Sequence, residues 1–125
     1  MNFSLSSTIQ THPTWPYEAM KDAVLGKRYV LSLSFIGAAR ARSLNQTYRQ
    51  KTYVPNVLSF PLDAMTGEIY ICPQTAKREA AAFNLSESGY IAYLFIHGLV
   101  HLKGHDHGDT MDALERTYLR RFNIT

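Results

Sequence analysis

The chain has 125 residues with 46% hydrophobic side chains and a formal net charge of +3, a size that suits one domain, residues 1–125, around one core. The longest apolar stretch, 91–102, is interrupted by two histidines and is too short to span a bilayer, so no membrane partner is expected. The first residues lack the basic and apolar regions of a secretion signal, and the single cysteine, Cys72, excludes an internal disulfide, so we expect a soluble, cytoplasmic protein.

The first half of the chain predicts strands and helices in alternation. An edge strand is expected within residues 1–10, followed by a short helix over 17–25 that begins near Thr14. Residues 28–36 alternate apolar and polar side chains with a period of two, which is the pattern of a half-buried strand. Residues 38–49 have apolar side chains at mixed helical spacing and predict the next helix.

The second half of the chain predicts two strands and then three helices. The strands are expected over 57–60 and 68–71, with a turn between them that contains Pro61, Asp63 and Gly67. The helices are expected over 75–83, from Ser86 through the apolar stretch to 102, and from Asp109, as its cap, to about 121. This order predicts an α+β fold, a small mixed sheet with the helix of 86–102 packed on it.

Residues 97–107 contain four of the five histidines of the chain. His97 and His101 are four residues apart, and on a helix this spacing places both imidazoles on one face, within reach of one metal ion. Gly104 can adopt positive φ, end the helix and bring His107 back over the same face as a third ligand. Three imidazoles leave one of the four zinc positions open for water or substrate, which is the arrangement of a catalytic zinc site.

The alternative for any one of these histidines is a buried core position that binds no metal. Several imidazoles buried together without a metal would leave unpaired nitrogens, at a cost of roughly 1–3 kcal/mol each, which favours the metal site. His105 and Asp106 lie on the expected turn, where we predict that they orient a ligand or face solvent, with direct ligation as the alternative.

The same histidines fit the metalloprotease pattern His-Glu-x-x-His-x-x-Gly-x-x-His at all but one position. In that pattern the glutamate is the general base, and in this chain Gly98 takes its place. A glycine cannot accept a proton, and the loss of general-base catalysis typically costs about 10²–10⁴ in rate. Peptide hydrolysis by that route is therefore disfavoured.

Several separated segments share a pattern with one known family. Residues 97–107 read His-Gly-x-x-His-Leu-x-Gly-x-Asp-His, 44–49 read Leu-Asn-Gln-Thr-Tyr-Arg and 57–61 read Val-Leu-Ser-Phe-Pro, with 67–71 and 76–80 between them and the histidines. Together they resemble the YbeY family of metal-dependent endoribonucleases. The resemblance implies RNA cleavage in ribosomal RNA maturation and ribosome quality control, with ribosomal RNA and the small ribosomal subunit as partners. Gly98 and the stretch of 23–62 without an acidic side chain predict that the RNA is single-stranded.

The chain departs from the family pattern at two places. Pro55 and Asn56 stand where the family usually has Thr-Asp, so the charge that an aspartate contributes is absent from that position. His105 stands where the family commonly has a tyrosine. The chain is also on the short side for the family.

A basic region precedes the histidines in the sequence. Between Ala23 and Leu62 the chain has no acidic residue and six basic ones, which are Lys27, Arg28, Arg40, Arg42, Arg49 and Lys51. Such a region can be merely a solvated surface, but beside a hydrolytic metal it favours the binding of phosphate. Arg40, Arg42 and Lys51 are therefore candidate RNA contacts. Tyr48 and Tyr53 are candidates for stacking on a base, with packing in the core as their alternative.

The expected mechanism assigns one role to each group. Zinc bound by His97, His101 and His107 would lower the pKa of its water toward about 7 and polarise a phosphoryl oxygen, with another divalent transition metal as the alternative ion. The resemblance implies that Arg49 is functional, and its planar guanidinium suits the scissile phosphate. The general base stays open between the metal hydroxide and the RNA 2′-hydroxyl.

Two other classes of function are also compatible with these residues. One is a zinc-dependent hydrolase of a peptide or a small phosphoester. The other is a ribosome-associated binding protein with a structural zinc site.

Overall fold

Four strands form one mixed sheet in the computed structural model, which describes residues 2–9, 11–104 and 108–124. The strands are β1 (Phe3–Ser7), β2 (Val30–Phe35), β3 (Val57–Asp63) and β4 (Thr66–Ile71), and their order across the sheet is β1-β2-β4-β3. The strands β1 and β4 both pair with β2 in parallel, whereas β3 pairs with β4 antiparallel. The edge position of β1 and the mixed sheet confirm the sequence prediction.

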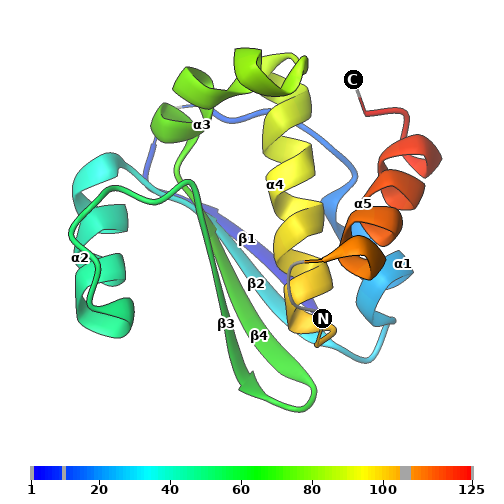
Figure 1. Ribbon diagram of the computed structural model, residues 1–125. Helices are drawn as coiled ribbons and strands as arrows, with labels where there is room; N and C mark the ends of the chain where they lie inside the picture. The colour runs from blue at the N-terminus through cyan, green and yellow to red at the C-terminus, as the bar shows by residue number, and fades with distance from the viewer. Residues whose placement is uncertain (1, 10, 105–107, 125) are drawn as a thin grey trace.

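Helices cover both faces of this sheet (Figure 1). The helices are α1 (Tyr17–Leu25), α2 (Ala38–Arg49), α3 (Pro73–Glu79), the 3-10 turn η1 (Ala80–Phe83), α4 (Glu87–Leu102) and α5 (Asp109–Arg121). Figure 1 shows α4 against the sheet with α1 and α5 outside it, and α2 on the opposite side of the sheet. The predicted α+β fold, with the histidine-bearing helix packed on the sheet, is confirmed. No helix in the described ranges is long and apolar enough to cross a membrane.

The core lies between α4 and the sheet. In β2, Leu31, Leu33 and Phe35 are fully buried on the side of α4, as their alternation predicts. The helix α4 is apolar around most of its circumference, and nearly all of its residues from Gly89 to Val100 are buried. It begins as predicted, because the Ser86 hydroxyl accepts a hydrogen bond from the Gly89 N–H at 2.9 Å and so satisfies an open donor of the first turn.

The turn between β3 and β4 is shorter than predicted. Pro61 and Asp63 belong to β3, and Gly67 belongs to β4, where it pairs with Pro61. A proline lacks the N–H that a ladder requires, so it is tolerated in a strand at the edge of a sheet, which is where β3 lies. The strand register also shifts between Pro61 and Asp63.

Three helix boundaries also differ from the prediction. The helix expected over 75–83 begins at Pro73, because proline suits the first helical position, and changes to the 3-10 turn after Glu79. The cap of α1 is Pro16 rather than Thr14. The cap of α5 is Gly108 rather than Asp109, which lies in the first turn, where its carboxylate interacts favourably with the helix dipole.

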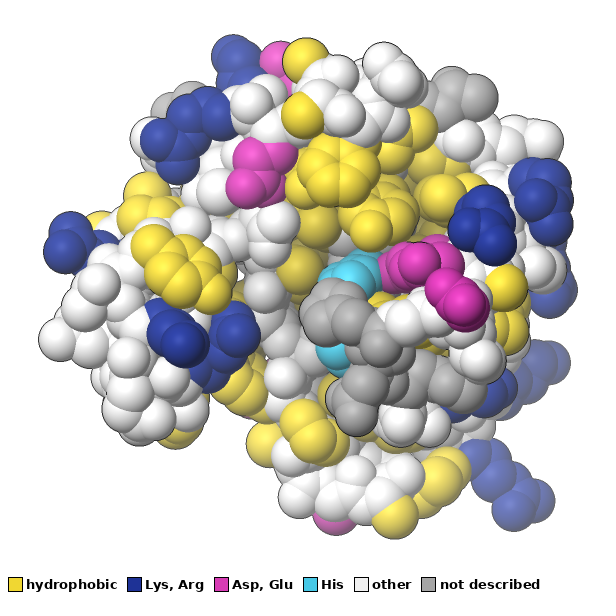
Figure 2. Space-filling model, viewed as in Figure 1, with side chains coloured by type: hydrophobic (Ala, Val, Ile, Leu, Met, Phe, Trp, Pro, Cys, Tyr) yellow, Lys and Arg dark blue, Asp and Glu magenta, His cyan; other side chains and the backbone are white. Residues whose placement is uncertain are grey.

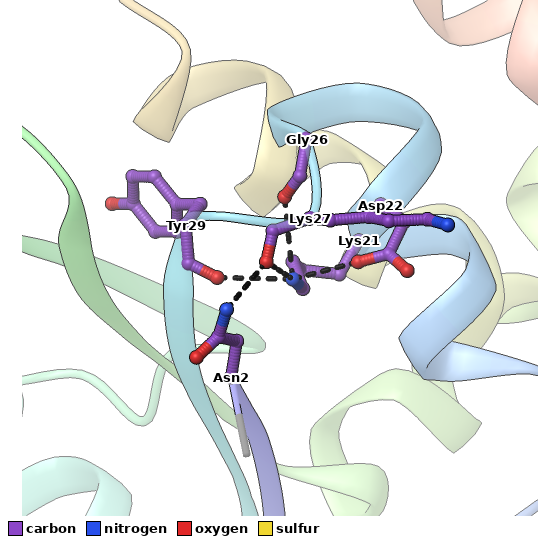
Figure 3. A network of polar contacts seen from close by, with 6 residues as sticks. All are labelled: Asn2, Lys21, Asp22, Gly26, Lys27 and Tyr29. Carbon is purple, nitrogen blue, oxygen red and sulfur yellow. Dashed lines mark hydrogen bonds and ion pairs between the residues drawn. The ribbon is translucent and has the colours of Figure 1, made fainter.

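A buried cation fixes the carboxyl end of α1 (Figure 3). Lys21 is 1% exposed, and its Nζ lies 2.7 Å from Oδ1 of Asp22. The same ammonium group donates to three backbone carbonyls, those of Gly26, Lys27 and Tyr29, at 3.2, 3.3 and 2.9 Å. The ammonium group thus satisfies carbonyls of the segment that follows the helix, and it fixes the path from α1 into β2.

Candidate functional site

A cavity of about 520 Å³ lies beside α4 at the β3 side of the sheet. Its lining comes from three parts of the chain, namely the end of α2 with the residues after it (Arg49, Tyr53, Asn56), β3 (Val57, Leu58, Ser59, Pro61) and α4 (His97, His101, Leu102). Figure 2 shows the histidines in a hollow, with Lys and Arg side chains across from them and acidic side chains beside them. The cavity therefore brings imidazoles and a guanidinium to one place.

His97 and His101 lie together as their spacing predicts. Their ring centroids are 4.7 Å apart, in an edge-to-face arrangement, and both line the cavity. Gly104 has φ +106°, which confirms the predicted positive φ after the helix. The third predicted ligand, His107, and its neighbours His105 and Asp106 lie outside the described residues. Within the described residues there is no group of three His, Cys, Asp or Glu side chains arranged for a metal.

Glu115 is a residue of this site that the sequence interpretation missed. The Nδ1–H of His97 donates a hydrogen bond to Oε2 of Glu115, which α5 brings against α4. Glu115 is 4% exposed. The available signal was its place on α5, since Met111, Tyr118 and Phe122 follow helical spacing from it and pack into or against the core. A glutamate on the apolar face of a helix requires a polar partner.

Gly98 faces the sheet rather than the cavity. A Cβ atom at this position would lie 2.9 Å from Oγ of Ser59 and 3.0 Å from Cδ1 of Ile69. Oγ of Ser59 also donates to the Gly98 carbonyl at 3.4 Å. The position that carries the general base in the metalloprotease pattern is thus part of the contact between α4 and the sheet, and it has no room for a longer side chain.

The end of α2 is held in place by a buried amide. Asn45 is fully buried, and its Nδ2 donates to the Tyr53 carbonyl at 3.1 Å. The backbone carbonyl of Asn45 accepts a hydrogen bond from the Lys51 N–H at 3.2 Å, across a left-handed Gln50 with φ 55°. These bonds reverse the chain after Arg49, so that Arg49 and Tyr53 both line the cavity.

The other predicted RNA contacts are exposed in the same region, and of these only Tyr53 also lines the cavity. Tyr48 is 65% exposed and Tyr53 is 55% exposed, so the alternative that they pack in the core is wrong. Tyr48 contacts Phe60 with ring centroids 5.5 Å apart. Three further predicted contacts, Arg40, Arg42 and Lys51, are exposed and do not line the cavity.

A carboxylate lies next to Asn56, the position at which the chain departs from the family pattern. Oε1 of Glu79 accepts hydrogen bonds from Nδ2 of Asn56 at 2.9 Å and from the Tyr90 hydroxyl at 3.1 Å. Burial, followed by the charge of Glu79, raises the pKa of Tyr90 to about 12, so its hydroxyl remains a donor at neutral pH. A negative charge is therefore present beside the cavity, although Asn56 itself is neutral.

The fold and the cavity define an α+β protein in which a pair of imidazoles and an arginine line one cavity. The family model described as Endoribonuclease YbeY matches residues 5–123. A curated Endoribonuclease YbeY from Pseudomonas putida (strain W619) is 39% identical over 102 residues, which cover 71% of this chain and 65% of that protein. A curated Endoribonuclease YbeY from Finegoldia magna is 41% identical over 108 residues, and the match covers 77% of this chain and 71% of that protein. The chain therefore belongs to the YbeY family.

A solved structure shows the same fold at lower identity. The solution structure of TM1509 from Thermotoga maritima has a TM-score of 0.62 and 22% identity, and the match covers 96% of this chain and 88% of that one. In sequence, the matched part spans 65% of the first Pseudomonas putida relative and 61% of the relative from Pseudomonas savastanoi.

Proposed function

We propose that this protein is a metal-dependent endoribonuclease that cleaves single-stranded RNA in ribosomal RNA maturation and ribosome quality control. The observation that carries the proposal is that His97, His101 and Arg49 all line one cavity. Family membership supports the same activity, because the relatives are named as endoribonucleases. The position of Gly98 against the sheet argues against a protease.

The donor chemistry of the cavity suits one transition metal ion. His97 and His101 supply two adjacent imidazoles, and imidazole is a preferred ligand of zinc. His107 is the third proposed ligand. Bound there, zinc would supply a Lewis acid for hydrolysis of the phosphodiester.

The residues of α2 and the segment after it would hold the RNA. Arg49 can grip two phosphate oxygens at once and stabilise the charge that develops on them. Tyr48 and Tyr53 present exposed rings on which bases can stack, and Arg40, Arg42 and Lys51 would contact the backbone farther from the cavity. A flexible single strand can enter such a recess more easily than an A-form duplex, so we propose single-stranded RNA as the substrate. Family membership favours ribosomal RNA as that substrate and the small ribosomal subunit as a partner, in the cytoplasm.

A cleavage assay combined with metal analysis tests this function. We expect the purified protein to contain close to one equivalent of zinc and to cut labelled single-stranded RNA while leaving casein intact. His97→Ala should lose most of the zinc and the cleavage, because fewer protein ligands hold the ion less tightly. The matched control is His12→Ala, since His12 stacks on Phe35 and does not line the cavity. Zinc-dependent cleavage of casein with intact RNA would reverse the conclusion.

A further inference from the structure

We propose that Glu115 is a positioning residue that holds His97 in the orientation and tautomer needed for metal binding. The inference rests on the proposed metal-dependent function and adds a residue that does not itself touch the metal or the RNA. Its basis is the hydrogen bond from the Nδ1–H of His97 to Oε2 of Glu115.

The hydrogen bond decides which ring nitrogen of His97 can bind a metal. A carboxylate oxygen accepts hydrogen bonds, so this contact favours the imidazole form that carries its proton on Nδ1. The lone pair is then on Nε2, at the other side of the ring. A carboxylate in this position also makes the imidazole a more basic ligand and restricts rotation of the ring.

The surroundings of Glu115 fix its carboxylate in place. Glu115 is 4% exposed, and Met111, one turn before it on α5, is 1% exposed. One turn later, the Tyr118 hydroxyl donates to the Ala23 carbonyl of α1 at 3.4 Å. The end of α4 is also bonded to α1, because Nζ of Lys103 donates to the Val24 carbonyl of α1 at 3.0 Å. The helices that carry His97 and Glu115 are thus both bonded to the carboxyl end of α1.

The charge of Glu115 serves this contact rather than solubility. A buried carboxylate without a partner costs free energy, and His97 is the partner that the structure gives it. Asp112, three residues earlier on the same helix, is exposed and carries the same charge. If Glu115 acted on the metal ion only through its negative charge, Asp112 would act in the same way. If Glu115 acts through the imidazole of His97, removing the charge of Asp112 should leave metal binding unchanged.

Zinc affinity measured by competition with a chromogenic chelator tests the proposal without relying on activity. We expect Glu115→Gln to weaken zinc binding by about 10–100-fold, because the amide is a weaker acceptor for the Nδ1–H. Asp112→Asn, the control that removes the same charge from the surface, should bind zinc as the unaltered protein does. Nitrogen NMR of the metal-free protein should show the Nδ1–H tautomer of His97, and this preference should diminish in Glu115→Gln.

Three outcomes would overturn the proposal. One is unaltered zinc affinity in Glu115→Gln, and another is an equal loss in Asp112→Asn. The third is a loss in Glu115→Gln as large as that in His97→Ala, which would make Glu115 a ligand. Melting temperatures of the metal-free variants separate these results from a failure to fold. Full zinc affinity in His97→Ala would instead contradict the metal site of the proposed function, so the two failures are distinguishable.

Discussion

Arg49 is the residue at which substrate binding can be separated from metal binding. It is exposed at the end of α2 and lines the same cavity as the two imidazoles. We expect Arg49→Lys to cut RNA about 10²–10³ times more slowly, because a point charge cannot reproduce a two-point grip on phosphate. Arg49→Glu should abolish cleavage. Zinc content and melting temperature should stay unchanged in both variants.

The control for Arg49 is Arg42→Lys, an exposed residue of the same helix that does not line the cavity. It should cleave RNA at nearly the normal rate. An active Arg49→Lys enzyme, with normal zinc content, would show that Arg49 does not hold the phosphate.

Single residues differ in how far the sequence could predict their place. His97 and His101 were predictable because both belong to one helix, whose geometry fixes their separation. Glu115 was not, because its contact with His97 spans 18 residues and depends on how α5 docks against α4. The carboxylate beside Asn56 escaped prediction for the same reason, since Glu79 comes from α3 and is 23 residues away in sequence.

At the scale of the element, Lys21 is the residue on which the end of α1 depends. Replacing it by methionine removes the donor that three buried or half-buried carbonyls share, and leaves Asp22 without its ion pair. We expect Lys21→Met to lower the free energy of unfolding by about 2–3 kcal/mol, since bonds to a charged group contribute about 1.5–3 kcal/mol and unpaired acceptors are costly.

Urea denaturation monitored by circular dichroism measures this change. The matched control is Lys27→Met, because the Lys27 side chain is exposed while its backbone carbonyl still accepts from Lys21. Equal stability of the two variants would mean that the buried ammonium group contributes nothing to the fold.

The sequence predicted the elements well where their signal was local. The strand β2 was predicted correctly because its apolar side chains alternate, with one face buried. The helix α4 was predicted correctly because it is a long apolar stretch, buried around most of its circumference. The predicted end of β3 was wrong, because Pro61 indicates a turn unless the strand is known to lie at the edge of the sheet. The edge is a property of the strand order, β1-β2-β4-β3, which brings β1 beside β2 and separates β2 from β3. Local pattern does not contain that order.

At the scale of the whole molecule, charge is divided between the two sides of the cleft. The side of α2 is mainly basic, with Arg40, Arg42, Arg49 and Lys51 and no acidic residue between Ala23 and Leu62, although the Glu79 carboxylate from α3 lies beside Asn56. The side of α4 and α5 carries acidic side chains next to the histidines (Figure 2). This arrangement would direct an RNA backbone toward α2 rather than spread it over the surface.

We therefore expect RNA binding to depend steeply on salt through the basic residues of α2 and the segment after it. Each phosphate contact that is removed should reduce the slope of log affinity against log salt by about 0.7 for a single strand. Arg42→Gln should show this reduction in a fluorescence titration, whereas Arg120→Gln, an exposed change on α5, should keep the original slope. Identical slopes in both variants would contradict an RNA path along α2.

The helix α4 is at once the centre of the core and the carrier of both imidazoles, while α2 buries only Ala41 and Asn45 fully. Local opening of a segment requires little free energy when few of its side chains are buried, and approaches the cost of global unfolding when the segment forms the core. The two walls of the cleft thus belong to different cooperative units. We therefore expect hydrogen exchange to be slower for the backbone of His97 and His101 than for that of α2, whose opening would widen the entrance beside Arg49.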